Sequence, residues 1–465
     1  MLMFETRLVQ VKALWSAFKN PTLTDEREAA RNVWEQLPEE LKVDDQALGR
    51  HSAGCAATYG VMEACDFKCT ACYLADSANR TPPLPFEEVR GQLDVIRAYL
   101  GPWGNTQITA GEVTLLPCED LVRILQYCRE IELSAMVMTH GQNLLRNPRY
   151  LERLILEGGL SKLSIHIDTT QKGRLGMHAR DSETDINWIR DAFANLVRQT
   201  RRNTGRHFAA ATTYTVTEKN FDEIPSVMDW CMDNADAFRM ISFQPTADVG
   251  RNRESEQVGK REALWEKVCE GVGVELGNDA FKFGHPKCNS VSMMFVVKYE
   301  KDGEMQRRVM PVTRPENPKD KAFFESLFND SFEGFCPDGE STPMLLARLF
   351  GRLFHRPSMA IRIPSFSFGR IIEEREWMQD FIRAFMTGKR WSLSPFVVIV
   401  HNFMSSHELE TQEGQDRLQA CAFRVPVDGR MVSMCELNGT ELRKTLNVSD
   451  QERLVTVLEP NRRAS

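Results

Sequence analysis

The sequence contains no long apolar run. No stretch of the 465 residues reaches the length of about 18 uncharged apolar residues that a membrane-spanning helix needs. The segment MLMFETRLVQVKALWSAFKN carries charges within its apolar pattern and lacks a small-residue cleavage site, so it is not typical of a secretory signal peptide. We therefore expect a cytoplasmic protein, whose 12 cysteines serve metal ligation, catalysis or burial rather than disulfide formation.

The sequence also has no excess of basic over acidic residues. Lys and Arg number 58 against 65 Asp and Glu, which gives a formal net charge of -7. This balance predicts no general attraction to nucleic acid or to an anionic bilayer. Internal repeats and low-complexity segments are also absent, and the hydrophobic content of 42% is that of a globular protein. Small molecules, lipids and proteins remain as substrate classes.

The order of segments predicts an α/β fold. From residue 51 to about 275, six β-rich segments alternate with amphipathic ones, as in βα units with a parallel sheet. We predict a partial (β/α)6 barrel of the TIM type over 51–275, an N-terminal helical extension over 1–50, and a C-terminal α+β region over 276–465 that carries substrate contacts and a possible second cluster. In that last region the segments read as β-rich are SVSMMFVVKYE, SMAIRIPSFSF, PFVVIVHNF and ACAFRVPVDGRMVSMC.

Alternation within the predicted strands separates a polar from an apolar face. Alternate side chains of a strand point to opposite faces, so Ser164, His166 and Asp168 share one face of the fourth strand. The sixth strand places Gln244 on such a polar face. A closed eight-stranded barrel fills its interior with branched apolar side chains. A polar interior therefore favours an open barrel around a polar cofactor, and the alternative is a doubly wound sheet.

Three cysteines follow the first predicted strand. Cys65, Cys69 and Cys72 have the spacing C-x3-C-x2-C in the segment ACDFKCTACYLA. Three thiolates can hold a [4Fe-4S] cluster and leave one iron open to the amino and carboxylate groups of a methionine moiety. Two alternatives stay open at this point: an electron-transfer protein that uses Cys55 as a fourth ligand, and a zinc-binding structural protein.

This motif and the segment ITAGEVTLLP resemble the radical S-adenosylmethionine (radical SAM) superfamily over roughly residues 55 to 250. The resemblance implies a [4Fe-4S] cluster on the three cysteines and S-adenosylmethionine as cofactor. It also implies that the cofactor is cleaved to a 5'-deoxyadenosyl radical that abstracts hydrogen from a substrate, with an electron donor such as flavodoxin or ferredoxin as partner. The cofactor-binding residues that it implies are Tyr73, Gly111, Glu112, Ser164, His166, Asp168 and Gln244.

The sequence departs from the family pattern at three positions. Ala71 stands before the third cysteine, where an aromatic residue is usual, and Tyr73 follows it instead. Ala110 and Val113 flank the Gly111 and Glu112 pair where glycine and proline are common. None of these changes removes a ligand.

The segment 139–143, which follows the third strand, is a further cofactor or substrate candidate by position, or a turn that caps the next helix.

Four cysteines occur late in the chain. They are Cys288, Cys336, Cys421 and Cys435, and the last two bracket the hairpin signal Asp428-Gly429. Many radical SAM enzymes carry auxiliary clusters, and this ending is similar to tetraether-lipid synthase-like radical SAM proteins. We predict an auxiliary metal site with Cys288, Cys421 and Cys435 as ligands, and the alternative is that these are buried core cysteines. For the substrate of such an enzyme we expect a lipid or a peptide.

Overall fold

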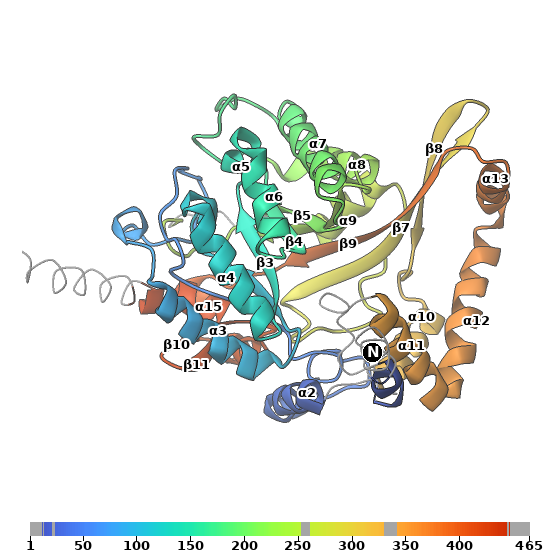
Figure 1. Ribbon diagram of the computed structural model, residues 1–465, viewed down its shortest axis with the longest axis horizontal. Helices are drawn as coiled ribbons and strands as arrows, with labels where there is room; N and C mark the ends of the chain where they lie inside the picture. The colour runs from blue at the N-terminus through green and yellow to red at the C-terminus, as the bar shows by residue number, and fades with distance from the viewer. Residues whose placement is uncertain are drawn as a thin grey trace, which may run out of the picture.

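The computed structural model describes residues 12, 14–20, 24–252, 261–329, 342–443 and 446. Its described strands form an 11-stranded sheet in the order β11-β10-β1-β2-β3-β4-β5-β6-β9-β7-β8 (Figure 1). The six strands β1 to β6 are mutually parallel and lie in chain order. They are β1 (Cys55–Ala57), β2 (Asn105–Ile108), β3 (Ser134–Thr139), β4 (Lys162–His166), β5 (Ala209–Val216) and β6 (Phe238–Pro245).

This strand order confirms the partial (β/α)6 barrel. A doubly wound sheet reverses its strand order at a switch point, and no such reversal occurs between β1 and β6. The sheet stays open rather than closing on itself. Helices follow the strands along the chain: α3 (Phe86–Leu100), α4 (Cys118–Glu130), α5 (Gln142–Arg146), α6 (Pro148–Leu156), α7 (Asn187–Thr204), α8 (Ile224–Asp233) and α9 (Arg261–Val272).

The predicted alternation in β4 is confirmed. Leu163, Ile165 and Ile167 are buried in the main apolar core together with apolar residues of the helices. Ser164 and His166 point the other way and line a cavity. Burying one face of each strand against amphipathic helices thus fixes which side chains face the barrel interior. Four cysteines are buried in the same core: Cys118, Cys128, Cys231 and Cys269.

The C-terminal region adds strands to both edges of the barrel sheet. β9 (Trp391–His401) pairs with β6, and β7 (Asn289–Lys301) and β8 (Glu304–Pro311) continue that edge. At the other edge β10 (Phe423–Val427) pairs with β1, and β11 (Arg430–Ser433) forms the expected hairpin around Asp428 and Gly429. The division of the chain at residues 50 and 275 stays a prediction.

One predicted strand is a helix. The segment SMAIRIPSFSF lies within α12 (Pro357–Glu373), although its β-branched and aromatic residues favour a strand. Its large apolar residues recur at helical spacing, and this outweighs local propensity. The remaining helices are α2 (Thr24–Gln36), α10 (Pro318–Asn329), α11 (Thr342–His355), α13 (Arg375–Met386), α14 (Gln412–Gln419) and α15 (Met434–Gly439). In the part of the chain that the structure describes, no helix is long and apolar enough to cross a membrane.

The two edges of the open sheet approach each other at a seam, which we define as the contact between residues 283–288 and residues 417–422. Gly284 has φ +84° and sits so close to the carbonyl of Ala420 that a Cβ atom would lie 2.5 Å from that oxygen. The Gln46 side chain donates to the Gly284 carbonyl at 3.1 Å. Arg417 donates to the Asn402 carbonyl at 2.5 Å. The first and last parts of the chain thus meet here.

The close packing at the seam predicts that a substitution at Gly284 destabilises the fold. Gly284→Ala should lower the free energy of unfolding by about 1–3 kcal/mol more than Gly303→Ala, because only the first variant pushes a methyl group into a backbone carbonyl. Gly303 is the matched control, since it has φ +85° and nothing within 4 Å of its Cβ position. Denaturant unfolding followed by circular dichroism measures the difference. Equal losses in the two variants would show that residues 283–288 do not pack against 417–422.

Candidate functional site

A cavity of about 230 Å³ opens at the carboxyl ends of the parallel strands. Its walls come from the loop after β1, the ends of β2 to β6, and a C-terminal segment that includes Phe403, Phe423 and Cys435. Active sites of parallel αβ barrels are built at this end, from the loops that follow the strands. The cavity is therefore the candidate site.

Cys65, Cys69 and Cys72 converge on this cavity. All three thiols line it, and each is half-buried. The loop that carries them is held at two points to the loop after β4, where Lys68 N–H donates to the Lys172 carbonyl at 2.8 Å and Thr70 N–H donates to the Thr170 carbonyl at 2.9 Å. The spacing of the motif thus places three soft sulfur donors around one point.

The three thiols are neutral without a metal. Burial raises the pKa of Cys65 to about 12 and raises the pKa of Cys69 and Cys72 as well, and for Cys65 and Cys69 the neighbouring thiols contribute in the same direction. Thiolate ligands therefore require the positive charge of a metal centre, and binding releases protons. Donors of this type suit an iron–sulfur cluster or zinc.

The spacing of the sulfurs favours a cluster over one zinc ion. Tetrahedral zinc with bonds of about 2.3 Å brings thiolate sulfurs to about 3.8 Å from one another. Among the residues that the structure describes, the only three metal-ligating side chains of Cys, His, Asp and Glu with ligand atoms all within 4.8 Å of one another are Cys65, Asp66 and His140. Cys65, Cys69 and Cys72 are therefore spread more widely, as the separated irons of a cuboidal cluster require.

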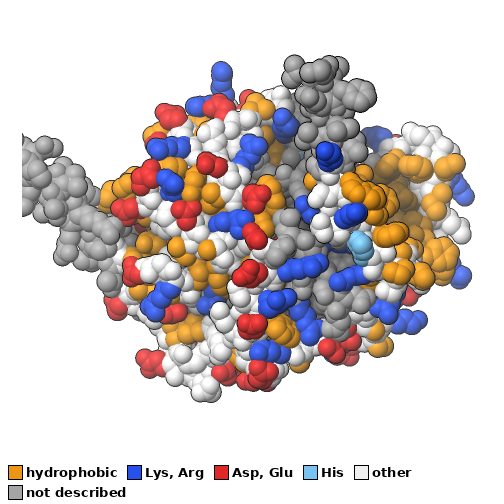
Figure 2. Space-filling model, turned by 60° about the horizontal axis from the view of Figure 1, so that its bottom comes forward, with side chains coloured by type: hydrophobic (Ala, Val, Ile, Leu, Met, Phe, Trp, Pro, Cys, Tyr) orange, Lys and Arg blue, Asp and Glu red, His pale blue; other side chains and the backbone are white. Residues whose placement is uncertain are grey.

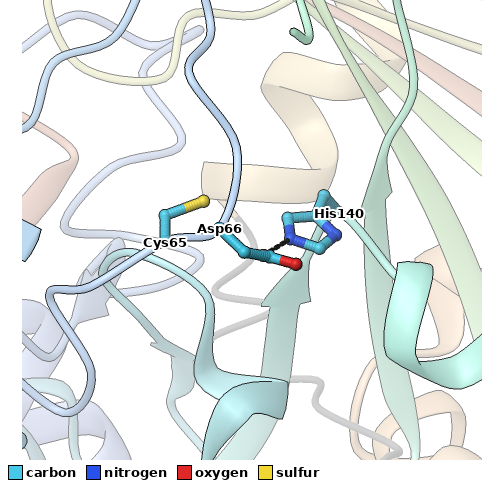
Figure 3. Close-up of side chains that lie close together, drawn as sticks. All are labelled: Cys65, Asp66 and His140. Atoms are coloured by element: carbon cyan, nitrogen blue, oxygen red, sulfur yellow. Dashed lines mark hydrogen bonds and ion pairs between the residues drawn. The ribbon is translucent and has the colours of Figure 1, made fainter. Parts of the chain in front are cut away.

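His140 stabilises the loop that carries the three cysteines (Figure 3). Its Nδ1 accepts from the backbone N–H of Gln142 at 3.1 Å, which leaves the proton on Nε2. Nε2 donates to the Asp66 carboxylate at 2.7 Å and so lowers the pKa of that carboxyl. The ring also stacks on Phe67 with centroids 3.7 Å apart. Because both ring nitrogens are engaged, we assign His140 to positioning the loop rather than to ligation.

Glu112 is fully buried beneath the cavity floor. One carboxylate oxygen accepts from the N–H of Thr114 at 3.0 Å and from the hydroxyls of Thr114 and Thr139, both at 2.5 Å. The other oxygen accepts from the N–H of His140 at 2.7 Å. The side chain expected to contact the methionine ammonium thus ties the ends of β2 and β3 together, while still lining the cavity.

Gly111 allows a close backbone approach, but to another part of the protein. It has φ +59°, and a Cβ atom there would lie 2.1 Å from the carbonyl oxygen of Met62 and 2.5 Å from that of Glu63. The adjoining N–H of Glu112 donates to the Ala64 carbonyl at 3.0 Å. Gly111 is therefore needed to seat the loop after β2 against the segment leading into the cysteine motif.

The polar face of β4 reaches the cavity through Ser164 and His166, whereas Asp168 lies behind them. Asp168 is fully buried, does not line the cavity, and accepts from His166, Thr170 and the N–H of Thr215. Burial raises the pKa of Asp168, but the His166 ring and these hydrogen bonds outweigh it, so the net shift is downward. Asp168 is thus placed to orient His166.

The remaining predicted cofactor residues also line the cavity. Gln244 lies at the end of β6, where its side chain is 3.4 Å from the Ser242 hydroxyl. Tyr73 is partly exposed, and the guanidinium of Arg443 lies 5.3 Å from its ring centroid. The segment 139–143 contributes Thr139 and His140 to the wall.

Sequence patterns gave no sign of Arg174. This buried side chain donates to the carbonyls of His140 and His166 and to the Gln171 amide. Its Nη1 is buried and has no hydrogen-bond partner among the described residues. Burial lowers the pKa of Arg174 to about 10, and the nearby Asp168 and Cys69 oppose that shift. Arg174 does not line the cavity, and its hydrogen bonds join the segments that follow β3 and β4.

The late cysteines gather at the seam rather than at this loop. Cys421 raises the pKa of Cys55, Cys288 and Cys435 by its proximity, in each case after burial. Cys55 stands at the start of β1, whereas the loop of Cys65, Cys69 and Cys72 follows that strand. The alternative in which Cys55 completes the first cluster is therefore not favoured. Cys336 lies outside the described residues.

Comparison with known proteins gives two relatives. One is 7,8-dihydro-6-hydroxymethylpterin dimethyltransferase from Methanocaldococcus jannaschii, 23% identical over 198 residues, which are 42% of this chain and 37% of that protein. The other is GTP 3',8-cyclase 1 from Pseudomonas aeruginosa, 28% identical over 203 residues, which are 42% of this chain and 55% of that protein. The chain thus aligns with about a third to a half of the length of these relatives.

Solved structures and family models add little to this comparison. Streptococcus suis SuiB bound to S-adenosylmethionine matches with a TM-score of 0.35 and 18% identity, over 47% of each chain. No protein-family model matches the sequence. The two relatives are both radical SAM proteins, a superfamily whose cofactors are a [4Fe-4S] cluster and S-adenosylmethionine. The chain therefore has radical SAM homologues, and it carries three cysteines at the mouth of an open (β/α)6 barrel.

Proposed function

We propose that the chain is an enzyme that cleaves S-adenosylmethionine reductively and uses the resulting 5'-deoxyadenosyl radical to abstract hydrogen from a lipid or a peptide. The observation that carries this proposal is the convergence of Cys65, Cys69 and Cys72 on a cavity at the carboxyl ends of the strands. When bound there, a [4Fe-4S] cluster supplies the electron that breaks a carbon–sulfur bond of the sulfonium. A flavodoxin or ferredoxin is the proposed electron donor.

The protein's own groups bind and orient the cofactor. Glu112 offers a carboxylate to the ammonium of the methionine part. Ser164 and His166, with Asp168 behind them, offer hydrogen bonds to the ribose. Gln244 and Tyr73 line the same cavity and are the residues that we propose for the adenine. Asp168 thus acts as a positioning residue through His166.

The substrate side of the cavity is apolar. Phe403, Met404, Phe423 and Met434 form part of the wall that the C-terminal region contributes. Two other phenylalanines of the C-terminal region do not line the cavity, since Phe396 is buried in the core and Phe366 stacks on Phe323. An apolar wall excludes water and stray hydrogen donors from a radical. It therefore supports a lipid or an apolar peptide side chain as substrate.

Loss of any one cysteine of the motif should abolish cofactor cleavage. Cys65→Ala, Cys69→Ala and Cys72→Ala should each yield no 5'-deoxyadenosine with dithionite and S-adenosylmethionine, because an incompletely held cluster cannot chelate the cofactor. Liquid chromatography of the products measures this loss. Cys128→Ala, a core cysteine on α4, is the control that should retain cleavage. Retained cleavage in two of the three motif variants would refute the proposal.

Glu112 should have a binding role beyond its structural one. Glu112→Ala should weaken S-adenosylmethionine binding by about tenfold to a hundredfold, since a charge-assisted hydrogen bond contributes about 1.5–3 kcal/mol. Thr114→Ala is the matched control, because it removes a donor to the same carboxylate but does not line the cavity. Both variants should lower the free energy of unfolding, and only the first should weaken binding in isothermal titration. If Glu112→Ala and the parent protein bound S-adenosylmethionine with equal affinity, the role of Glu112 would be structural only.

A further inference from the structure

Four cysteines from distant parts of the chain meet at the seam. Cys55 N–H donates to the Ala422 carbonyl at 2.8 Å, and the Cys55 thiol lies 3.5 Å from the same oxygen. β1 and β10 pair in parallel with Cys55 opposite Phe423. Cys421 is therefore next to Cys55 in space, although 366 positions separate them in the sequence.

Cys435 and Cys288 reach the same place from two other elements. Arg424 pairs with Ser433 across the β10–β11 hairpin, and Cys435 follows two residues later in α15, where it interacts electrostatically with Cys421 and Cys288. Cys288 ends the segment whose Gly284 packs on the Ala420 carbonyl, and its own carbonyl accepts from the N–H of Asn402 at 2.8 Å. Three thiols thus come from one edge of the open sheet and the fourth from the other edge.

A buried cation accompanies these thiols. Arg417 is 3% exposed, and its Nε is buried with no hydrogen-bond partner among the described residues. Arg417 interacts electrostatically with both Cys288 and Cys435. Its Nη2 and Nη1 bind the Asn402 carbonyl at 2.5 Å and Glu408 at 3.4 Å, which leaves Nε for another acceptor. Arg417 also interacts with the Cys288 thiol through a side-chain hydrogen bond, so the buried guanidinium faces these thiols and suits an anionic group held by them.

We infer that Cys55, Cys288, Cys421 and Cys435 bind a second [4Fe-4S] cluster. Four thiolates ligate all four irons, so this cluster has no open iron for cofactor or substrate. The cluster carries net negative charge, which Arg417 balances, and the N–H of Phe423, 3.4 Å from the Cys421 sulfur, donates to one of its ligands. It would fasten the two edges of the open sheet and, through Cys435, border the candidate cavity.

Sulfur spacing favours a cluster over a single zinc ion at this site. No three of these four sulfurs lie within 4.8 Å of one another, since the described residues contain one such trio of possible metal ligands and it lies elsewhere. A single zinc ion would need them about 3.8 Å apart. The inference adds Cys55 to the three cysteines that the sequence suggested, and it stands independently of the proposed function.

Iron analysis in the absence of the first cluster tests this site. The triple variant Cys65→Ala, Cys69→Ala, Cys72→Ala, reconstituted anaerobically, should hold about four irons and about four sulfides per chain. Adding Cys55→Ala or Cys435→Ala to it should reduce the iron to less than a quarter. Adding Cys269→Ala, a buried cysteine on α9, should change nothing. All of these variants lack the three ligands of the proposed catalytic cluster, so the measured iron content does not depend on cofactor cleavage.

Three outcomes would overturn the inference. An iron-free triple variant that is folded by circular dichroism would show that no second cluster exists. One zinc and no iron per chain would replace the cluster by a structural ion. Full iron retention on adding Cys55→Ala would remove Cys55 as a ligand. Should the Ala variants fail to fold, Cys55→Ser and Cys435→Ser keep the side-chain volume and should show the same iron loss.

A separate surface of the molecule is apolar and basic. α11 and α12 expose large apolar side chains at helical spacing: Leu346, Phe350 and Phe354 on α11, and Ile361, Phe368 and Ile372 on α12. From Thr342 to Phe368 the sequence has four arginines and no Asp or Glu; Arg362 is exposed, Arg348 and Arg356 are half-buried, and Arg352 is buried. Figure 2 shows apolar side chains gathered on the right of the molecule, where α11 to α13 lie, with Lys and Arg side chains around them.

We also infer that this exposed face of α11 and α12 binds an anionic lipid bilayer. Amphipathic helices with apolar side chains on one face and Arg nearby lie in the plane of a membrane interface. The concentration of positive charge argues against a second copy of the chain as occupant, because the two identical faces would repel each other. The net charge of -7 conceals this local excess, which is why total charge predicted no attraction to a bilayer.

Vesicle sedimentation tests the bilayer inference. The protein should bind vesicles of phosphatidylcholine with phosphatidylglycerol, bind pure phosphatidylcholine less, and be released by high salt. Ile361→Asp with Phe368→Asp should weaken binding by about tenfold or more, because two apolar anchors become charged. Leu156→Asp with Leu175→Asp is the matched control, since these residues are 57% and 68% exposed elsewhere on the molecule and should bind as the parent does.

Other results would refute this inference. Equal binding to charged and neutral vesicles, or none to either, would remove the role of the arginines. An equal loss in the control variant would remove the role of α11 and α12. If light scattering shows that the parent is a dimer and that the Ile361 and Phe368 variant is a monomer, the face binds a second copy of the chain.

Discussion

The buried carboxylate of Glu112 organises the candidate site. A carboxylate without solvent must be compensated by hydrogen bonds, and Glu112 receives them from Thr114, Thr139 and the backbone of His140. These contacts join the end of β2 to the end of β3 and fix His140, whose ring holds Asp66 next to Cys65. The first cysteine is thus positioned through a continuous set of contacts that begins at Glu112. A cofactor ammonium at Glu112 would add to this network rather than create it.

The C-terminal region completes the barrel instead of standing beside it. Its strands extend the sheet at both edges, and its segments supply part of the cavity wall. An open barrel leaves two unsatisfied sheet edges, which natural proteins cover or pair. Here β9 pairs with β6 and β10 pairs with β1, so the same chain protects both edges. The four cysteines at the seam lie where these two additions meet.

Local signals in the sequence were sufficient for some parts of the structure. The spacing of Cys65, Cys69 and Cys72, the alternation in β4 and the Asp428-Gly429 turn each depend on a few neighbouring residues, and the structure bears out the strand and the turn. The helix α12 was misread because local propensity and periodicity disagree there. Arg174 and the meeting of Cys55 with Cys421 depend on contacts between distant segments, which no local pattern encodes.

One continuous element links the outer apolar surface to the cavity. α13 ends at Met386, β9 begins at Trp391, and the chain leaving β9 places Phe403 and Met404 in the cavity wall. β9 also pairs with β6, whose end carries Gln244. An enzyme that takes an apolar substrate from a bilayer needs a fixed distance and orientation between its membrane-binding face and the wall of its active site. A strand within the central sheet provides a rigid connection of this kind. β9 therefore connects the exposed apolar helices physically to the wall of the candidate cavity.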